Sequence, residues 1–101
     1  MSHNKRLLLI ITENAFKGMA QIAHYLAQNF TVSISLDYLK SLEQIFDTLL
    51  DMPDLGSPYK GEVRKFIYKK YTLIFYRYDA QYLFVLDIID SRSNPVLKLL
   101  T

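Results

Sequence analysis

The residues of this sequence best suited to chemistry are three arginines in its second half, Arg64, Arg77 and Arg92, with lysines at positions 65, 69 and 70. An arginine can bind a phosphate or a carboxylate through two parallel hydrogen bonds, so this set suits a polyanion or an acidic protein partner. Rings on which nucleic-acid bases could stack come from Tyr76, Tyr78 and Tyr82. The alternative is that the tyrosines are ordinary packing in a half-buried sheet and that the arginines pair with Asp87, Asp90 or helix C-termini.

Other catalytic signatures are missing from the sequence. It has no glycine-rich phosphate loop, no H-E-x-x-H motif, no nucleophile elbow and no cysteine. His3 lies in the polar start, and His24 lies off the apolar stripe of a predicted helix, as a partly exposed structural histidine would. Asp87 and Asp90 are three apart on a predicted strand and should point to opposite faces. We therefore predict no metal site, no cofactor and no evident general acid or base.

Length and composition predict one domain spanning residues 1–101. Half of the residues are hydrophobic, which is enough to fill a core without disulfides or a metal. No apolar run is long enough for a signal peptide or a membrane span, so we expect a cytoplasmic protein. Residues 1–59 carry four Lys/Arg and six Asp/Glu, whereas residues 60–101 carry eight and four. The second half is therefore the basic half.

Three runs rich in β-branched and aromatic residues predict an antiparallel meander over residues 63–68, 71–78 and 82–89. Arg64 opens its first strand and Arg77 closes its second, so antiparallel pairing should bring both to one end of the sheet. Arg92 follows the third strand, and a strong sheet twist would bring it to Arg64. We expect the three arginines to gather at one rim.

Before the meander, residues 7–11 form a continuous apolar run typical of a strand buried on both faces. Residues 12–14 supply helix-start residues, and apolar residues then recur at helical spacing as far as Phe30. Gly18 inside this helix suggests close packing. Residues 31–36 fit either a strand or a second helix capped by Thr31 and running to about Asp51, and we favour the helix.

The remaining segments are a turn at residues 52–58 and a short apolar tail at residues 96–101. The order β-α-α-β-β-β predicts an α+β fold in which a helical hairpin packs on a small, twisted, mainly antiparallel sheet. One side of the meander should then show Phe66, Tyr68, Phe75 or their alternates as an apolar strip. Such a strip marks a partner site unless the tail covers it, and an edge strand could also accept an added strand.

The sequence resembles the RelE/ParE superfamily of type II toxin–antitoxin toxins, often described as plasmid stabilisation proteins. The matching pieces are spread over nearly the whole chain: an opening strand before Thr12-Glu13-Asn14-Ala15, then Ile22-Ala23-His24-Tyr25-Leu26, Met52-Pro53-Asp54-Leu55-Gly56, Val63-Arg64, Ile74-Phe75-Tyr76-Arg77 and Ile88-Ile89-Asp90-Ser91-Arg92. The resemblance implies a small bacterial toxin held inactive by a cognate antitoxin, which lays a helix or extended segment across an apolar groove.

The superfamily has two branches that matter here. RelE-like members cleave mRNA on the ribosome without a metal, and ParE-like members inhibit DNA gyrase. This sequence has Thr72 where many ribonucleases carry Arg, and Asp90 where His is frequent, and no Tyr or His follows Arg92. These departures favour a ParE-like toxin that is not an enzyme.

We accordingly predict a surface that binds the target or the antitoxin, made of Arg64, Lys65, Arg77, Tyr78 and Arg92. The alternatives are a metal-independent ribonuclease with Arg64, Arg77 and Arg92 as its catalytic candidates, and a degenerate member that only binds antitoxin.

Overall fold

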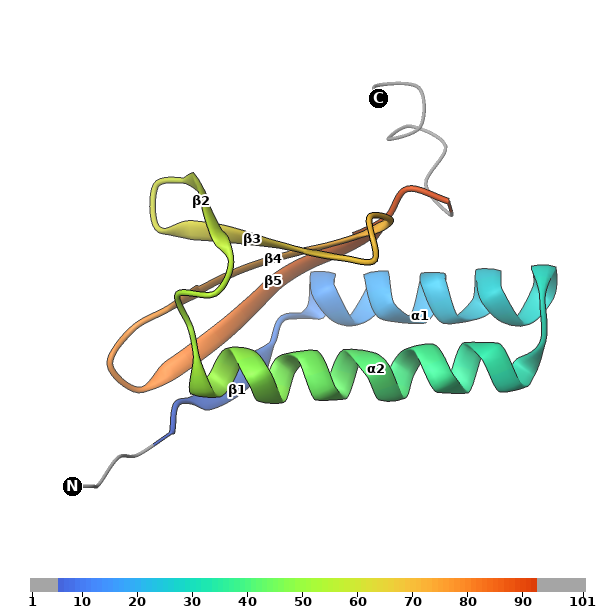
Figure 1. The fold of residues 1–101 in the computed structure, drawn as a ribbon, viewed down its shortest axis with the longest axis horizontal. Coiled ribbons are helices and arrows are strands. Elements are labelled where there is room, and N and C mark those ends of the chain that lie inside the picture. Colours follow the sequence, from blue (N-terminus) through green and yellow to red (C-terminus); the bar gives the residue numbers. More distant parts are fainter. Residues whose placement is uncertain (1–5, 93–101) are drawn as a thin grey trace.

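The computed structural model describes residues 6–92 and contains two helices and one five-stranded sheet. The elements in chain order are β1 (Leu8–Ile11), α1 (Glu13–Asn29), α2 (Val32–Asp51), β2 (Ser57–Lys60), β3 (Val63–Tyr68), β4 (Thr72–Tyr78) and β5 (Tyr82–Asp90). The strand order is β1-β5-β4-β3-β2, with β1 parallel to β5 and the other pairs antiparallel. Both helices lie beneath the sheet (Figure 1). The predicted α+β fold is confirmed.

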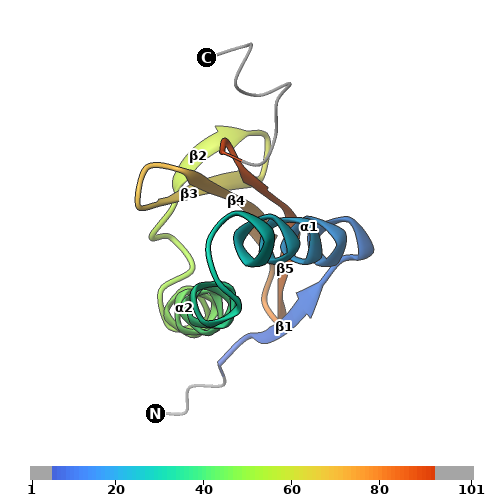
Figure 2. The same cartoon turned by 90° about the vertical axis from the view of Figure 1, so that its right-hand side faces the viewer.

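Each helix begins at a threonine. The Thr12 hydroxyl accepts a hydrogen bond from the Ala15 N–H at 3.2 Å, and the Thr31 hydroxyl accepts one from the Ile34 N–H at 3.0 Å. Each bond satisfies one of the N–H groups that the first turn of a helix leaves unpaired. The helical interpretation of residues 31–36 is therefore correct, and the two helices run side by side as a hairpin (Figure 2).

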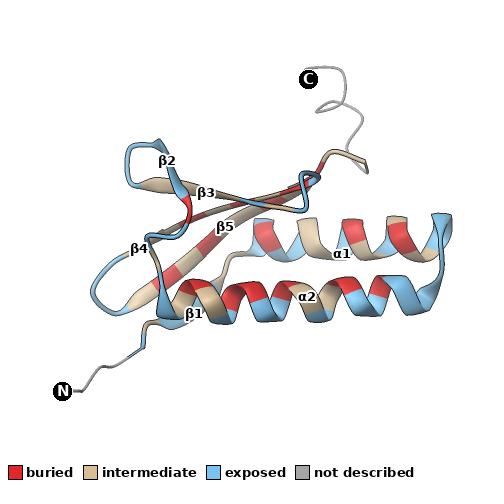
Figure 3. Cartoon of the chain, viewed as in Figure 1, coloured by how far each residue is buried: buried red, intermediate tan, exposed pale blue. Residues whose placement is uncertain are grey.

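The core lies between the helical hairpin and the face of the sheet that it covers (Figure 3). Each helix contributes one stripe and strands β4 and β5 contribute alternate residues, as a half-covered sheet requires. The fully buried apolar side chains include Ile22, Leu42, Leu49, Ile74, Tyr76, Leu83, Val85 and Ile88. None of the helices among residues 6–92 is long and apolar enough to cross a lipid bilayer.

Helix α1 approaches β5 very closely at Gly18. A Cβ atom built on this residue would lie 2.3 Å from the backbone carbonyl oxygen of Ile88. The predicted close packing at Gly18 is confirmed, and it results from contact with a strand backbone rather than with a side chain.

A β-bulge at Leu86 comes just before the two acids of β5, Asp87 and Asp90. Phe75 pairs with Asp87 and Tyr76 pairs with Val85, so Leu86 is the extra residue on β5. Beyond the bulge Asp90 pairs with the buried Thr72, while Asp87 lies beside Phe75 on the opposite face of the sheet. The prediction that these two aspartates point to opposite faces is confirmed.

Strand β1 is not buried on both faces, contrary to the prediction. It forms the edge of the sheet, and Leu8 is 63% exposed. The apolar run suggested a central strand, but the helices cover only one face and β1 has a neighbour on one side only.

The other edge strand, β2, was not predicted at all. It pairs antiparallel with β3, Pro58 opposite Arg64, and its four residues are all exposed. A short exposed strand that contains proline carries no apolar alternation.

The predicted outer strip was also partly wrong, because Phe66 and Tyr68 pack toward the helices and only Phe75 lies on the other face. The predicted apolar tail and His3 lie outside the described residues.

Candidate functional site

The five residues predicted to bind a partner fall in three separate places. Arg64 pairs with Tyr76 at one end of the β3–β4 ladder, on the helix side. Arg92 follows Asp90, which pairs with Thr72 at the other end of the ladder. The four residue steps from Thr72 to Tyr76 span about 13 Å at the usual rise of a strand. Lys65 and Arg77 lie on the face opposite the helices, so the predicted single rim of three arginines is wrong.

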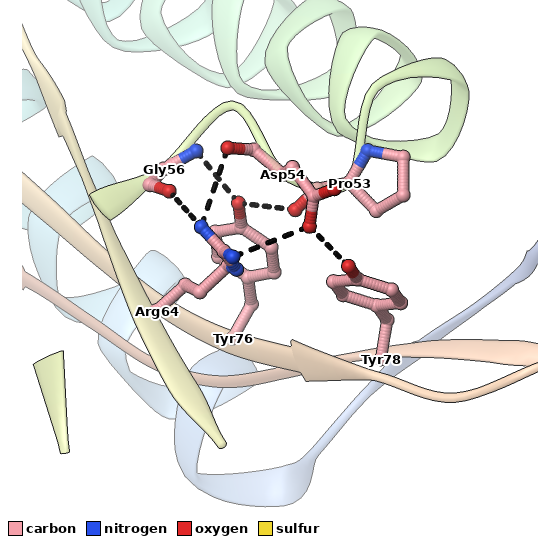
Figure 4. Close-up of polar contacts among 6 residues, drawn as sticks. All are labelled: Pro53, Asp54, Gly56, Arg64, Tyr76 and Tyr78. Carbon is pink, nitrogen blue, oxygen red and sulfur yellow. Dashed lines mark hydrogen bonds and ion pairs between the residues drawn. The ribbon is translucent and has the colours of Figure 1, made fainter. Parts of the chain in front are cut away.

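Arg64 is bound by the turn that joins α2 to β2 (Figure 4). Its guanidinium donates to the Gly56 carbonyl at 2.6 Å and to the Asp54 carbonyl at 3.3 Å, and it forms an ion pair with the Asp54 carboxylate at 3.3 Å. The same carboxylate accepts a hydrogen bond from the Tyr78 hydroxyl, which raises the pKa of Tyr78. Arg64 and Tyr78 are therefore held within the fold by Asp54.

Tyr76 binds the same turn from the sheet. Its buried hydroxyl accepts from the Gly56 N–H at 2.8 Å and donates to the Pro53 carbonyl at 2.8 Å (Figure 4). Burial raises the pKa of this phenol. A Cβ on Gly56 would lie 2.7 Å from the Tyr76 hydroxyl oxygen, so the turn fits only without a side chain there. This cluster is a structural one: it fixes the turn on the sheet.

We expect Tyr76→Phe to lower the free energy of unfolding by about 2 kcal/mol, because it leaves two backbone groups of the turn without a partner. Urea denaturation measures the change. Tyr78→Phe is the matched control, since its more exposed hydroxyl bonds to Asp54 alone among residues 6–92, and it should cost under about 1 kcal/mol. Equal losses in the two variants would contradict a structural role for the Tyr76 hydroxyl.

At the far end of the ladder Arg92 is paired with Asp90, which is 1% exposed. The guanidinium donates to the two carboxylate oxygens at 3.0 and 2.8 Å, and the Arg92 backbone N–H donates at 2.9 Å. Burial alone would favour the neutral acid, but these bonds and one from Thr72 keep the pKa of Asp90 below its ordinary value. One possibility considered from the sequence, arginine pairing with Asp90, is thus confirmed.

The Asp90 network extends into helix α2. Tyr38 and Thr72 share a hydrogen bond of 2.6 Å between their hydroxyls, and Thr72 donates to Asp90 at 2.9 Å. Burial raises the pKa of Tyr38 to about 12, although the bond to Thr72 opposes the shift. A phenol with so high a pKa stays protonated at neutral pH and is poorly suited to act as a general base.

A cavity of about 540 Å³ opens beside this network, between α2 and the β3–β4 turn. Its walls include Leu26, Ile34, Tyr38, Tyr68 and Tyr71, and its cations are Lys69 and Arg92. Both cations lie over aromatic rings: Lys69 is 5.5 Å from the centre of Tyr68, and Arg92 is 4.6 Å from that of Tyr71. The cavity is large enough for a small molecule or several side chains of a partner.

Lys65 and Arg77 are a second pair of predicted residues that the structure brings together, besides Arg64 and Tyr78 at Asp54. Lys65 pairs with Phe75, and Arg77 follows Phe75 by two residues on the same face of β4. The Arg77 guanidinium lies 4.1 Å from the ring centre of Phe84, and the Lys65 ammonium lies 5.6 Å from that of Tyr59. Both cations therefore lie on an aromatic surface on the face of the sheet that the helices leave open.

The arginines could be identified from the sequence, but most of the residues that bind them could not. Asp54, Tyr76 and Thr72 all lie in segments that the sequence singled out, but their roles depend on contacts between distant segments. Among residues 6–92, no group of three or more His, Cys, Asp or Glu side chains could hold a metal ion. His24 is exposed on α1 and does not line the 540 Å³ cavity.

Comparisons with known proteins identify a family and a solved structure that this chain resembles. The family model described as "ParE toxin of type II toxin-antitoxin system, parDE" matches residues 9–95. A solved structure titled "Chromosomal ParDE TA system from P. aeruginosa" superposes with a TM-score of 0.73 at 13% identity, covering 84% of this chain and 96% of that one. At this identity the superposition shows a shared fold. No curated protein matches the sequence.

Proposed function

Because this chain belongs to the ParE toxin family of type II toxin–antitoxin systems, we propose that it is the toxin of such a pair, that it binds a DNA gyrase-type target and that a cognate antitoxin neutralises it. The family match over residues 9–95 is the observation that carries this proposal. We expect the protein to act in the cytoplasm, where such a target would be.

The geometry of the arginines supports a toxin that acts by binding rather than by catalysis. General acid–base cleavage needs an acid and a base within hydrogen-bond reach of the reacting atoms. Arg64 and Arg92 are already paired with Asp54 and Asp90, and they lie at opposite ends of the β3–β4 ladder. Arg77 lies on the other face of the sheet. These positions do not form one catalytic set.

A supercoiling assay tests the proposed target. Purified protein without antitoxin should inhibit DNA supercoiling by gyrase, and adding antitoxin should restore it. Induction of the toxin alone should stop growth, and co-expression of the antitoxin should rescue it. Normal supercoiling at a large excess of toxin, together with growth arrest on induction, would refute gyrase as the target and leave the toxin assignment standing.

One observation keeps the ribonuclease alternative testable: Arg92 and Lys69 line a cavity that also has aromatic walls. If the protein cleaves mRNA, primer extension on transcripts from induced cells should map translation-dependent cuts, and Arg92→Ala should abolish them. Absence of such cuts in cells whose growth is arrested would exclude this function. Induction without any growth defect, at good expression, would instead indicate a degenerate member that only binds antitoxin.

A further inference from the structure

The face of the sheet opposite the helices, here called the outer face, carries an apolar surface. Its members alternate with the buried residues of the same strands and include Ile10, Ile67, Phe75 and Phe84. Ile67 is 51% exposed and Ile10 is 37% exposed. Neither helix covers this face (Figure 1). Apolar side chains gathered on an uncovered face are typical of a protein interaction site.

Two cations without carboxylate partners are set into this surface. Arg6, Arg64 and Arg92 each form an ion pair with an aspartate, whereas no ion pair within residues 6–92 involves Arg77 or Lys65. Each of these two cations lies over an aromatic ring, so its position is fixed while its donors stay available. The pKa of Asp79, two residues after Arg77, is lowered by hydrogen bonds from the backbone N–H groups of Gln81 and Tyr82 and also by the charge of Arg77, but no ion pair joins the two side chains among residues 6–92. A guanidinium held in this way can donate two hydrogen bonds to a carboxylate of a partner.

Asp87 is an acid on the outer face, and it pairs with Phe75 on the side away from Lys65. One of its carboxylate oxygens accepts the Ile88 N–H at 2.9 Å. Charge on this surface is therefore arranged across the strands, with the cations on β3 and β4 and the acid on β5.

We propose that the outer face binds an apolar segment of the antitoxin that carries carboxylates, an inference that rests on the proposed toxin function. Apolar side chains of the segment pack on Phe75, Phe84 and Ile67, one carboxylate accepts two hydrogen bonds from Arg77, and a second meets Lys65. The charge arrangement sets the orientation of the segment, because its acids must lie over β3 and β4 and away from Asp87.

Charge reversal tests this surface. The probe is the antitoxin expressed from the reading frame adjacent to this chain's own, and calorimetry measures its affinity for the full chain. The double variant Lys65→Glu/Arg77→Glu should bind roughly 100-fold more weakly than the unmodified chain, since attraction becomes repulsion at two sites. The matched control Lys17→Glu/Lys40→Glu changes the net charge equally on the exposed side of the helices and should stay within about threefold.

Ile67→Ser tests the apolar part of the surface independently of charge. Its exposed position makes a folding defect small, and it should weaken antitoxin binding about fivefold. Circular dichroism melting of each variant establishes that the fold is retained.

Three results would refute the proposed antitoxin-binding surface without contradicting the toxin function. They are antitoxin binding by the Lys65→Glu/Arg77→Glu variant at the unmodified affinity, an equal loss in the Lys17→Glu/Lys40→Glu control, or a dimer of the unmodified chain that the outer-face variant abolishes without affecting antitoxin binding. Failure of the unmodified chain to bind antitoxin at all would instead refute the proposed function.

Discussion

Replacing Gly18 with alanine should destabilise the protein by roughly 2–3 kcal/mol, although the same change in a helix interior ordinarily stabilises by up to about 1 kcal/mol. The added methyl group would lie 2.3 Å from the Ile88 carbonyl oxygen and 3.3 Å from its carbonyl carbon. Backbone atoms of a strand cannot rotate away as a side chain can. The helix must therefore move off the sheet, and the buried contacts of Ala15 and Ile22 on either side loosen with it.

Urea denaturation of the Gly18→Ala variant measures this effect. Gly61→Ala is the control: its Cβ would meet nothing within 4 Å, but the residue has a φ of +57°. The control should lose only about 1 kcal/mol, which is the cost of a left-handed backbone conformation. A Gly18→Ala variant as stable as the unmodified chain would show that α1 can shift without loss, and would contradict the close contact with β5.

Asp90→Ala should lower the free energy of unfolding by about 3 kcal/mol or more. The substitution removes the carboxylate that accepts from the Arg92 side chain, the Arg92 backbone and Thr72. Thr72 is buried, and the Arg92 side chain is only 29% exposed, so water replaces these bonds poorly. Asp87→Ala on the outer face of the same strand is the control and should cost less than about 1 kcal/mol.

The same carboxylate should make stability depend on pH. The native pKa of Asp90 is depressed, so ionised Asp90 stabilises the fold at every pH above its unfolded value of about 3.9, and this contribution is lost as the pH falls through the lower native pKa. Denaturation midpoints measured from pH 7 down to pH 3 should therefore fall more steeply for the unmodified chain than for Asp90→Asn. Parallel curves would show that Asp90 is not the group responsible.

The helices could be predicted closely from the sequence because their signals are local. A threonine cap, an apolar stripe of period 3.6 and a terminating turn all lie within the segment that they define. The meander could be predicted equally well, since its strands are rich in β-branched and aromatic residues and its turns are short. The first strand was predicted at residues 7–11 but was wrongly expected to be buried on both faces, and β2 was not predicted. Whether a strand is central or at an edge depends on its neighbours in space and not on its own residues.

The candidate site was harder to predict for a related reason. Arginine side chains were correctly identified as chemically capable, but their roles were decided by acids from other elements. Asp54 binds Arg64 from the turn after α2, and Asp90 binds Arg92 only because the β5 bulge turns that carboxylate toward Thr72. A bulge of one residue is not visible in an alternation pattern. Arg77 has no such partner among residues 6–92, and it is the arginine that still offers free donors.

The parallel pairing of β1 with β5 has a consequence for how the chain folds. Leu8 lies beside Tyr82, so the first strand cannot pair with its neighbour until β5 has been synthesised and has left the ribosome. The helical hairpin and the meander are built from contacts between adjacent segments and can form early. We therefore expect β1 to join the sheet last, and translation to delay the completed fold until β5 is available.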